Sequence, residues 1–209
     1  MLRYINNITI RTNYSTIFSA LGYKRKSTEL SDSFKKEITG WINDAAEAIK
    51  LDAVTIRCGI SLPEKGSVEL FPEDNPAKTF RLESASLHKF LSGSSKAQVM
   101  GITAGSVITE LIDNCQRENM TKAVVLDAAA GEIVDNGLDY IISLLNRELV
   151  RESGKLLSKR FSPGYGDLAL ESQGKFFTLL EMERLGVKLT ESFMLLPQKS
   201  VIAITGIVY

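Results

Sequence analysis

The stretch TKAVVLDAAAGEIVDNGLDYIISLL, residues 121–145, decides how the rest of the chain is interpreted. Its apolar side chains recur at three- and four-residue intervals, which is the spacing of one face of an α-helix. The sequence therefore predicts a long amphipathic helix that begins at Thr121. Its apolar stripe consists of Val125, Leu126, Ala129, Ile133, Val134, Leu138, Ile141, Ile142 and Leu145. Gly131 and Gly137 interrupt the helix at a cost of roughly 1 kcal/mol each relative to Ala, so we expect them to permit close packing or the approach of a ligand.

Further helices and strands are predicted on both sides of this stretch. Ser31 is placed to cap a helix that runs to Ile49, and another helix runs from Val107 toward Asn119. Short helices are expected at 16–21, which ends at Gly22, and at 87–91. Alternating or continuous apolar runs predict strands at 5–10, 54–60, 68–70, 79–82, 97–103, 193–196 and 201–204.

Strands near both ends of the chain, with long helices between them, predict the fold class. We expect an α+β fold in which a mixed or antiparallel twisted sheet is flanked by long helices. The last two strands, with a turn around Pro197–Lys199 between them, predict a terminal hairpin. The apolar residues from Phe176 to Leu185 predict one helix that stops at Gly186. Because 209 residues suit one domain, residues 1–209 are expected to form a single domain.

The balance of charge argues against two classes of partner. Lys+Arg and Asp+Glu both number 25, so no overall basic field favours nucleic acid or an anionic membrane. No apolar run approaches the roughly 18 residues of a membrane-spanning helix, and the first residues lack the apolar core of a signal peptide. We therefore expect a cytoplasmic protein.

The two cysteines, Cys58 and Cys115, form no CxxC pair, so we expect reduced thiols with a packing role. The residues Tyr23–Lys26 predict a short basic loop.

The familiar catalytic and phosphate-binding patterns are missing from the sequence. Gly101–Ser106 has neither the GxGxxG pattern nor a GK[ST] ending. His88 is the only histidine, with no cysteine near it, so it predicts neither a metal site nor a catalytic relay. Glu132 and Asp135 are one helical turn apart near the apolar face of the long helix, a position that an ordinary amphipathic boundary explains as well.

The segment Arg160-Phe161-Ser162-Pro163-Gly164-Tyr165, followed by Gly166, combines several residue types that suit a small-molecule site. A Pro-Gly turn lets backbone amides and carbonyls face a ligand, and an arginine can hold a carboxylate through two parallel hydrogen bonds. Tyr165 adds an aromatic ring that can cover a ligand. An ordinary surface turn explains the same residues, so physical reasoning alone leaves both interpretations open.

These six residues resemble the R-x-x-P-G-Y loop of the activation, or reactivation, domain of cobalamin-dependent methionine synthase. Several downstream segments are similar, in order and near spacing, to the next helix and strands of that domain. They are Leu179-Leu180-Glu181, the sequence GVKLTESF at 186–193, Pro197, and Ser200-Val201. The resemblance covers about the last quarter of the chain, and Leu21-Gly22-Tyr23 and the helix around Glu132 are weakly similar to short, stand-alone forms.

The resemblance implies an S-adenosylmethionine-binding module that supports reductive methylation of cob(II)alamin on a separate corrinoid methyltransferase, which we expect to be methionine synthase. The partner carries the cobalamin, flavodoxin or another reductant supplies the electron, and the module mainly positions its ligand. By the same resemblance, Arg160 holds the ligand carboxylate and Glu132 favours the ammonium or sulfonium charge. The backbone of Ser162, Pro163 and Gly164 lines the adenosyl part, and Tyr165 packs beside it.

Two other interpretations stay open from the sequence. One is a non-catalytic adaptor of a corrinoid protein that keeps the fold and no longer binds S-adenosylmethionine. The other is a self-sufficient S-adenosylmethionine methyltransferase acting on a small molecule. That class is expected to show a glycine-rich turn after the first strand of a parallel sheet, and the sequence lacks such a turn.

Overall fold

The computed structural model describes residues 1–23 and 30–209, so most of the predicted basic loop at Tyr23–Lys26 lies outside the described residues. The helices are α1 (Tyr14–Ala20), α2 (Asp32–Ala48), α3 (Ala85–Leu91), α4 (Ser106–Glu118), α5 (Met120–Leu149) and α6 (Gln173–Leu180). The strands are β1 (Arg3–Ile8), β2 (Leu51–Ser61), β3 (Ser67–Pro72), β4 (Phe80–Glu83), β5 (Lys96–Thr103), β6 (Lys155–Leu156), β7 (Lys188–Leu189), β8 (Leu195–Leu196) and β9 (Ser200–Val208). Short 3-10 turns are η1 (Pro76–Lys78), η2 (Val150–Glu152), η3 (Leu170–Ser172) and η4 (Met182–Leu185).

A twisted antiparallel sheet forms the centre of the molecule, with the strand order β4-β3-β2-β5-β9-β6. Strand β2 is long enough to have two neighbours on one edge, because its first half pairs with β1 and its second half with β3. Along its other edge it pairs with β5 from Asp52↔Thr103 to Gly59↔Lys96. The α+β prediction with an antiparallel sheet is confirmed, and this arrangement does not match the parallel sheet expected for a self-sufficient methyltransferase.

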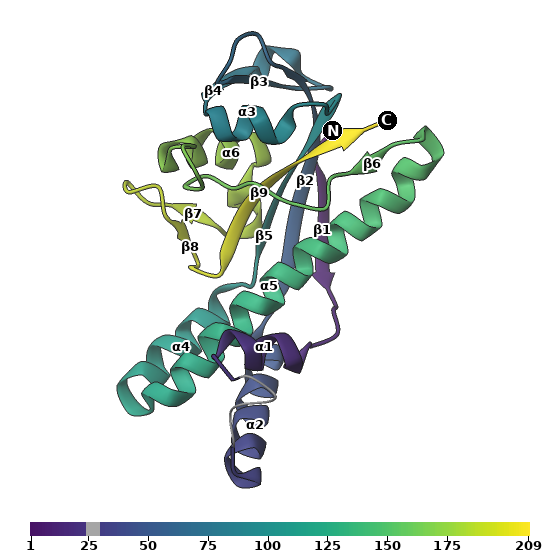
Figure 1. The fold of residues 1–209 in the computed structure, drawn as a ribbon. Coiled ribbons are helices and arrows are strands. Elements are labelled where there is room, and N and C mark those ends of the chain that lie inside the picture. The colour runs from purple at the N-terminus through teal and green to yellow at the C-terminus, as the bar shows by residue number, and fades with distance from the viewer. Residues whose placement is uncertain (24–29) are drawn as a thin grey trace.

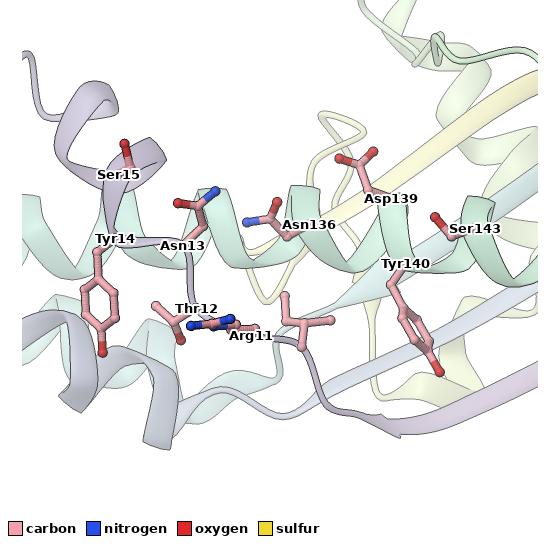
Figure 2. Close-up of a pocket in the computed structure, with 10 residues that line it drawn as sticks. Arg11, Thr12, Asn13, Tyr14, Ser15, Asn136, Asp139, Tyr140 and Ser143 are labelled. Atoms are coloured by element: carbon pink, nitrogen blue, oxygen red, sulfur yellow. The ribbon is translucent and has the colours of Figure 1, made fainter.

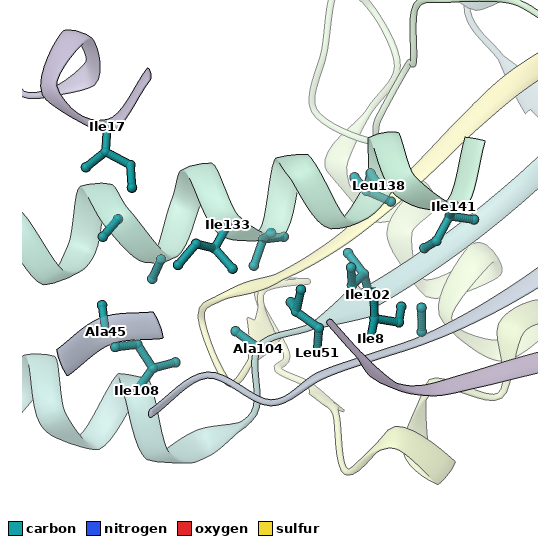
Figure 3. Close-up of a cluster of buried hydrophobic side chains, with 14 of the residues drawn as sticks. Ile8, Ile17, Ala45, Leu51, Ile102, Ala104, Ile108, Ile133, Leu138 and Ile141 are labelled. Carbon is teal, nitrogen blue, oxygen red and sulfur yellow. The ribbon is translucent and has the colours of Figure 1, made fainter. Parts of the chain in front are cut away.

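Helices cover both faces of the sheet (Figure 1). Successive side chains of a strand point to opposite faces, so Met100 and Ile102 of β5 face one core and Val99 faces the other. The first core lies under α1, α2, α4 and α5, and Figure 3 shows Ile108 and Leu138 packed in it. The second core lies under α3, α6 and η4. The sheet is therefore the middle layer, and α5 crosses one of its faces diagonally.

The two glycines of α5 differ in their surroundings. A Cβ atom at Gly137 would lie 2.6 Å from Ile102 Cδ1 and 3.2 Å from Leu51 Cδ1, whereas one at Gly131 would meet no atom within 4 Å. Close packing is therefore confirmed at Gly137, where the helix backbone rests directly on β2 and β5.

The predicted signals at the start of α2 and at the end of α1 are confirmed. Ser31 precedes α2, and its hydroxyl accepts a hydrogen bond from the backbone N–H of Phe34 at 3.3 Å. Gly22 follows α1 with φ of 84°, a left-handed conformation that glycine adopts at little cost.

Both cysteines are buried and unpaired, and burial raises the pKa of the Cys58 thiol to about 12.

The predicted terminal hairpin is wrong. β8 pairs with β7 in a separate small sheet, and β9 lies between β5 and β6. β5 offers β9 a continuous partner from Lys96↔Ile207 to Thr103↔Ser200, whereas β8 has only two residues to pair. A hairpin would have left the long edge of β5 unpaired, and buried backbone groups require partners.

The predicted single helix up to Gly186 is also wrong, because α6 ends at Leu180 and Glu181 adopts a left-handed conformation with φ of 49°. The break lets the fully buried Met182 lie against the β5 backbone at Gly101, in the space that a Cβ atom would occupy. A continuous helix would turn Met182 about 200° away from Leu180, so burying both side chains against the sheet favours the break.

Candidate functional site

The Arg160 loop, residues 160–167, connects β6 to η3 and is tied to the sheet near its start. The backbone N–H of Phe161 donates to the carbonyl of Ile204 at 2.9 Å, and the N–H of Ile204 donates back at 2.8 Å. The Phe161 ring packs against Phe90, with ring centres 5.7 Å apart. The start of the loop is therefore paired with β9. This pairing fixes the direction in which the Arg160 side chain points away from the sheet.

The middle of the loop is a tight turn with its own hydrogen bonds. The N–H of Tyr165 donates to the carbonyl of Ser162 at 3.1 Å, and the N–H of Gly164 donates to that of Leu168 at 2.9 Å. Gly164 has φ of 85° and Gly166 has φ of 56°, so both positions favour glycine. This geometry explains the two glycines of the motif without reference to a ligand.

The end of the loop is held by a carboxylate on the N-terminus of α3. Asp167 accepts hydrogen bonds from the Ser84 hydroxyl at 2.5 Å, the Ala85 N–H at 2.8 Å and the Ser86 N–H at 3.0 Å. The hydrogen bond from Ser84, with those from the backbone of α3, holds the pKa of the Asp167 carboxyl well below its usual range. Asp167 was not among the predicted site residues, and its only signal in the sequence is an acidic residue directly after Gly166.

The guanidinium of Arg160 forms ion pairs with two carboxylates of α5. Its guanidinium lies 3.4 Å from Asp135 Oδ1 and also hydrogen-bonds Asp139 Oδ1. The Arg160 side chain is only 19% exposed, whereas those of Asp135 and Asp139 are 63% and 64% exposed. Each such pair at a surface contributes roughly 0.2–1 kcal/mol. The two ion pairs orient the Arg160 side chain along the outer face of α5. They engage both terminal nitrogens of its guanidinium.

Glu132 lies on the same outer face of α5, because residues three and seven positions apart on a helix share a face. It precedes Asp135 by one turn and is half-buried. The structure therefore brings the predicted residues Arg160 and Glu132 onto one helix face, with Asp135 and Asp139 beside them.

The remaining predicted residues occupy the turn itself. Pro163 is buried, Ser162 is half-buried and Gly164 is exposed. Tyr165 is 62% exposed, and its ring meets the Phe161 ring edge to face, with centres 6.4 Å apart. Tyr165 thus presents a largely free aromatic ring next to the turn backbone.

A pocket of about 690 Å³ lies on the other side of Asp139, between α5 and the connection from β1 to α1 (Figure 2). Its lining residues are Ile10, Arg11, Thr12, Asn13, Tyr14, Ser15, Asn136, Asp139, Tyr140 and Ser143. Asp139 links this pocket to the loop, because the same carboxylate lines the pocket and receives Arg160. The pocket was not predictable from the sequence, since its two walls are more than a hundred residues apart in the chain.

The pocket carries polar groups without partners. The Asn136 side-chain nitrogen is buried and has no hydrogen-bond partner in the part of the chain that the structure describes. A buried donor left unpaired costs roughly 1–3 kcal/mol. Arg11 makes no ion pair with any described residue, and the other arginine at the site, Arg160, makes two. Both groups are hydrogen-bond donors, so their chemistry suits an anionic or carbonyl oxygen.

Two further findings bear on the class of site. No group of three or more His, Cys, Asp or Glu side chains within residues 1–23 and 30–209 is arranged to hold a metal ion. Among the same residues, no helix is both long and apolar enough to cross a bilayer.

The fold and the site together define an α+β domain in which a long helix on an antiparallel sheet carries a polar pocket beside an anchored arginine loop. A scan against protein-family models and a search of curated proteins gave no match. Among solved structures, the crystal structure of the MetH reactivation domain bound to AdoHcy is similar to this chain. The TM-score is 0.70 at 14% identity, over 99% of this chain and 78% of that chain. The chain therefore has the fold of the MetH reactivation domain, as the sequence predicts.

Proposed function

We propose that this chain is an S-adenosylmethionine-binding reactivation module, which supports reductive methylation of cob(II)alamin on a separate corrinoid methyltransferase such as methionine synthase. The observation that carries the proposal is the shared fold with the MetH reactivation domain bound to AdoHcy, together with an anchored R-x-x-P-G-Y loop at residues 160–165. AdoHcy is S-adenosylmethionine without its transferable methyl group, so a site for one suits much of the other. Residues 1–209 act in this proposal as one domain around the shared sheet.

The residues of the site fit the chemistry of this ligand. S-adenosylmethionine carries a carboxylate, an ammonium group and a sulfonium charge at one end and an adenosyl group at the other. Arg160 faces the carboxylate with the N–H groups that Asp135 and Asp139 leave open, since a guanidinium has five donors. Glu132 favours the ammonium or sulfonium charge, because opposite charges attract across a partly buried surface.

The turn of the loop receives the adenosyl part in this proposal. Gly164 is exposed, and a Cβ atom there would meet only Leu170 Cδ1, at 3.5 Å, so its backbone is open to a flat ring. Ser162 and Pro163 contribute backbone from the same turn, and Tyr165 packs beside the ring with its exposed face. The hydrogen bonds of the turn hold this surface before the ligand arrives, which reduces the entropy lost on binding.

The chemical role of the module is positioning. A reductant such as flavodoxin would supply one electron to the partner's cob(II)alamin, and the reduced cobalamin would take the methyl group of bound S-adenosylmethionine, with AdoHcy as the leaving group. The residues of this chain hold the ligand in one orientation and leave its sulfonium methyl group toward the partner, and positioning of this kind accounts for much of the rate of bimolecular reactions. We place this activity in the cytoplasm, together with the corrinoid protein and its reductant.

Isothermal titration calorimetry of Arg160→Ala tests the proposal. We expect the wild-type chain to bind S-adenosylmethionine and the variant to bind it roughly 10- to 150-fold more weakly, the loss expected for a charge-assisted hydrogen bond of about 1.5–3 kcal/mol. Arg3→Ala is the matched control, because Arg3 also binds a carboxylate of α5, Glu148, at 2.7 and 2.8 Å, and lies outside the loop and the pocket. Equal affinity of Arg160→Ala and wild type would reject the loop assignment.

A second experiment tests the partner and separates the adaptor alternative. The purified chain, S-adenosylmethionine, a reductant and candidate cob(II)alamin proteins are mixed, and the cobalamin spectrum is followed. Formation of methylcobalamin that requires the chain supports the proposal. A wild-type chain that binds a corrinoid protein and not S-adenosylmethionine would instead identify the non-catalytic adaptor.

A further inference from the structure

We propose that the pocket between α5 and the β1–α1 connection binds the zwitterionic amino-acid group of the ligand, with Arg11 as a second arginine for the carboxylate and Asp139 for the ammonium group. The inference rests on the proposed function for the identity of the ligand, because it assigns the part of the same site that takes the amino-acid end. It adds residues from the first fifteen positions of the chain to a site that the sequence placed around position 160.

Arg11 is better placed than Arg160 to make a two-pronged contact with a carboxylate. Arg160 has Asp135 and Asp139 on its guanidinium, whereas Arg11 is exposed in the pocket wall and makes no ion pair with any residue between 1 and 23 or 30 and 209. A bidentate arginine–carboxylate pair needs two parallel N–H donors on one edge of the guanidinium. Arg11 retains such an edge, and Arg160 then contributes one further donor from across Asp139.

Two amides beside Arg11 add donors for the same carboxylate. The side-chain nitrogen of Asn136 is buried without a partner in the described chain. Asn13 caps α1 through its side-chain oxygen, which accepts from the Thr16 N–H at 3.4 Å, so its amide N–H groups are left for a ligand. Figure 2 shows Asn13 and Asn136 on facing walls of the pocket. Both walls therefore contribute amide donors that an anionic oxygen in the pocket can accept from.

The counter-charge of the ammonium group is Asp139 at the border of the pocket, which leaves Glu132 to favour the sulfonium charge. Asp139 lines the pocket and is held by Arg160, so its carboxylate has a fixed position. With the ligand between Arg11 and Asp139, positive and negative charges alternate in one series. The series is Arg11, the ligand carboxylate, the ligand ammonium group, Asp139 and Arg160. Each neighbouring pair in that series attracts, which favours one orientation of the amino-acid group. Arg160 is then a positioning residue for Asp139 as well as a donor.

The walls and size of the pocket suit a small molecule. Its volume of about 690 Å³ falls in the range of small-molecule sites. The Tyr14 hydroxyl donates to Asn43 at 2.6 Å, which fixes its ring in one wall, and Tyr140 forms part of the opposite wall. The two rings supply apolar surface for the carbon chain of the amino-acid group, while the amides and Arg11 supply specificity.

Calorimetry with three ligands tests the assignment. The ligands are S-adenosylmethionine, free methionine, and 5′-methylthioadenosine, which keeps the adenosyl group and the sulfur and lacks the amino-acid group. Arg11→Ala is compared with Arg117→Ala, which removes another exposed arginine, from the last turn of α4. We expect Arg11→Ala to weaken S-adenosylmethionine binding about tenfold or more and to leave 5′-methylthioadenosine binding unchanged. Arg117→Ala should match wild type with both.

The outcomes separate this inference from the proposed function. Equal S-adenosylmethionine affinity of wild type and Arg11→Ala overturns the pocket assignment and leaves the proposed function standing. A wild-type chain that binds methionine, with Arg11→Ala weakened, and does not bind S-adenosylmethionine supports the pocket and rejects the proposed function. Equal losses of S-adenosylmethionine and 5′-methylthioadenosine in Arg11→Ala would show that Arg11 acts on the adenosyl end, which also overturns the inference.

Discussion

Alanine substitution of the two glycines in α5 tests how the helix that carries the site is held on the sheet. Gly131→Ala and Gly137→Ala lie in the same helix, so each gains the same helix propensity, about 1 kcal/mol. They differ in the space for the new methyl group. At Gly131 it meets nothing within 4 Å, whereas at Gly137 it would lie 2.6 Å from Ile102 Cδ1 and 3.2 Å from Leu51 Cδ1.

The magnitude follows from that contact. Ile102 is fully buried, and its Cδ1 is the atom that the new methyl group would meet first, so accommodating that group requires the core around Ile102 to shift. Overpacking of a core costs roughly 1–3 kcal/mol. Because the propensity gain is common to both variants, the free energy of unfolding of Gly137→Ala should fall below that of Gly131→Ala by this same amount. For a chain of this size, that corresponds to a Tm difference of roughly 2–12 °C.

Thermal and urea unfolding followed by circular dichroism measure the difference. We expect Gly131→Ala to be more stable than wild type by about 1 kcal/mol, with unchanged ligand affinity. Gly137→Ala should be the less stable variant and should bind S-adenosylmethionine more weakly, because moving α5 off β5 moves Asp139 away from Arg160. Equal stabilisation by both substitutions would refute the close packing of α5 on the sheet.

Two further predictions concern the anchoring of the loop. Because the folded-state pKa of Asp167 is lower than its unfolded-state value, its stabilisation is fully present above about pH 4 and is lost as the pH falls toward the folded-state pKa. The difference in unfolding free energy between wild type and Asp167→Asn, measured in urea, should therefore be largest near neutral pH and narrow below pH 4; a constant difference would contradict the role of the charge. Gly166→Ala places a side chain at φ of 56° with its Cβ 2.9 Å from Ser86 Oγ, so the free energy of unfolding should fall by about 1–2 kcal/mol. Unchanged urea unfolding would show that this turn relaxes freely.

Local signals predicted most of the helices and strands, since each rests on residues close together in the chain. Ser31 and its Phe34 partner fix the start of α2, and the apolar stripe of 121–145 fixes α5. The run 97–103 predicted β5 because most of its residues are apolar, as expected of a strand that is buried on both faces. These elements could be predicted without knowing which segments pack against them.

The two failures near the C-terminus have the opposite origin. Hairpin formation by β8 and β9 was the local solution, but β5 offered β9 a longer partner from a segment about a hundred residues away. Likewise, the apolar pattern around Met182 predicted that the helix continues. The chain breaks at Glu181 because Met182 fills the space beside the Gly101 backbone, which the local pattern could not reveal. Tertiary contacts overrode local preference in both places.

The candidate site was predictable in part for the same reason. The loop at 160–165 is a continuous segment, so its residue types were visible in the sequence. Of its two partners on α5, Asp135 stood out in the sequence beside Glu132, but nothing connected it with Arg160, and Asp139 has an ordinary helical context. Arg11 and Asn136 carried no signal at all, since a pocket wall becomes recognisable only when the β1–α1 connection lies against α5.

The charges on α5 give a physical reason for an arginine at position 160 beyond direct contact with a ligand. Asp135 and Asp139 are one turn apart, and like charges at that spacing destabilise a helix by roughly 0.2–0.5 kcal/mol. Arg160 lies against both, which offsets this repulsion and fixes Asp139 at the border of the pocket. Since the same loop is bonded to β9 through Phe161 and to α3 through Asp167, a displacement of α5 is opposed by the sheet and by a second helix. Arg160 therefore joins the loop, the helix and the pocket, so a ligand held by Arg11 and Asp139 contacts a frame that is already in place.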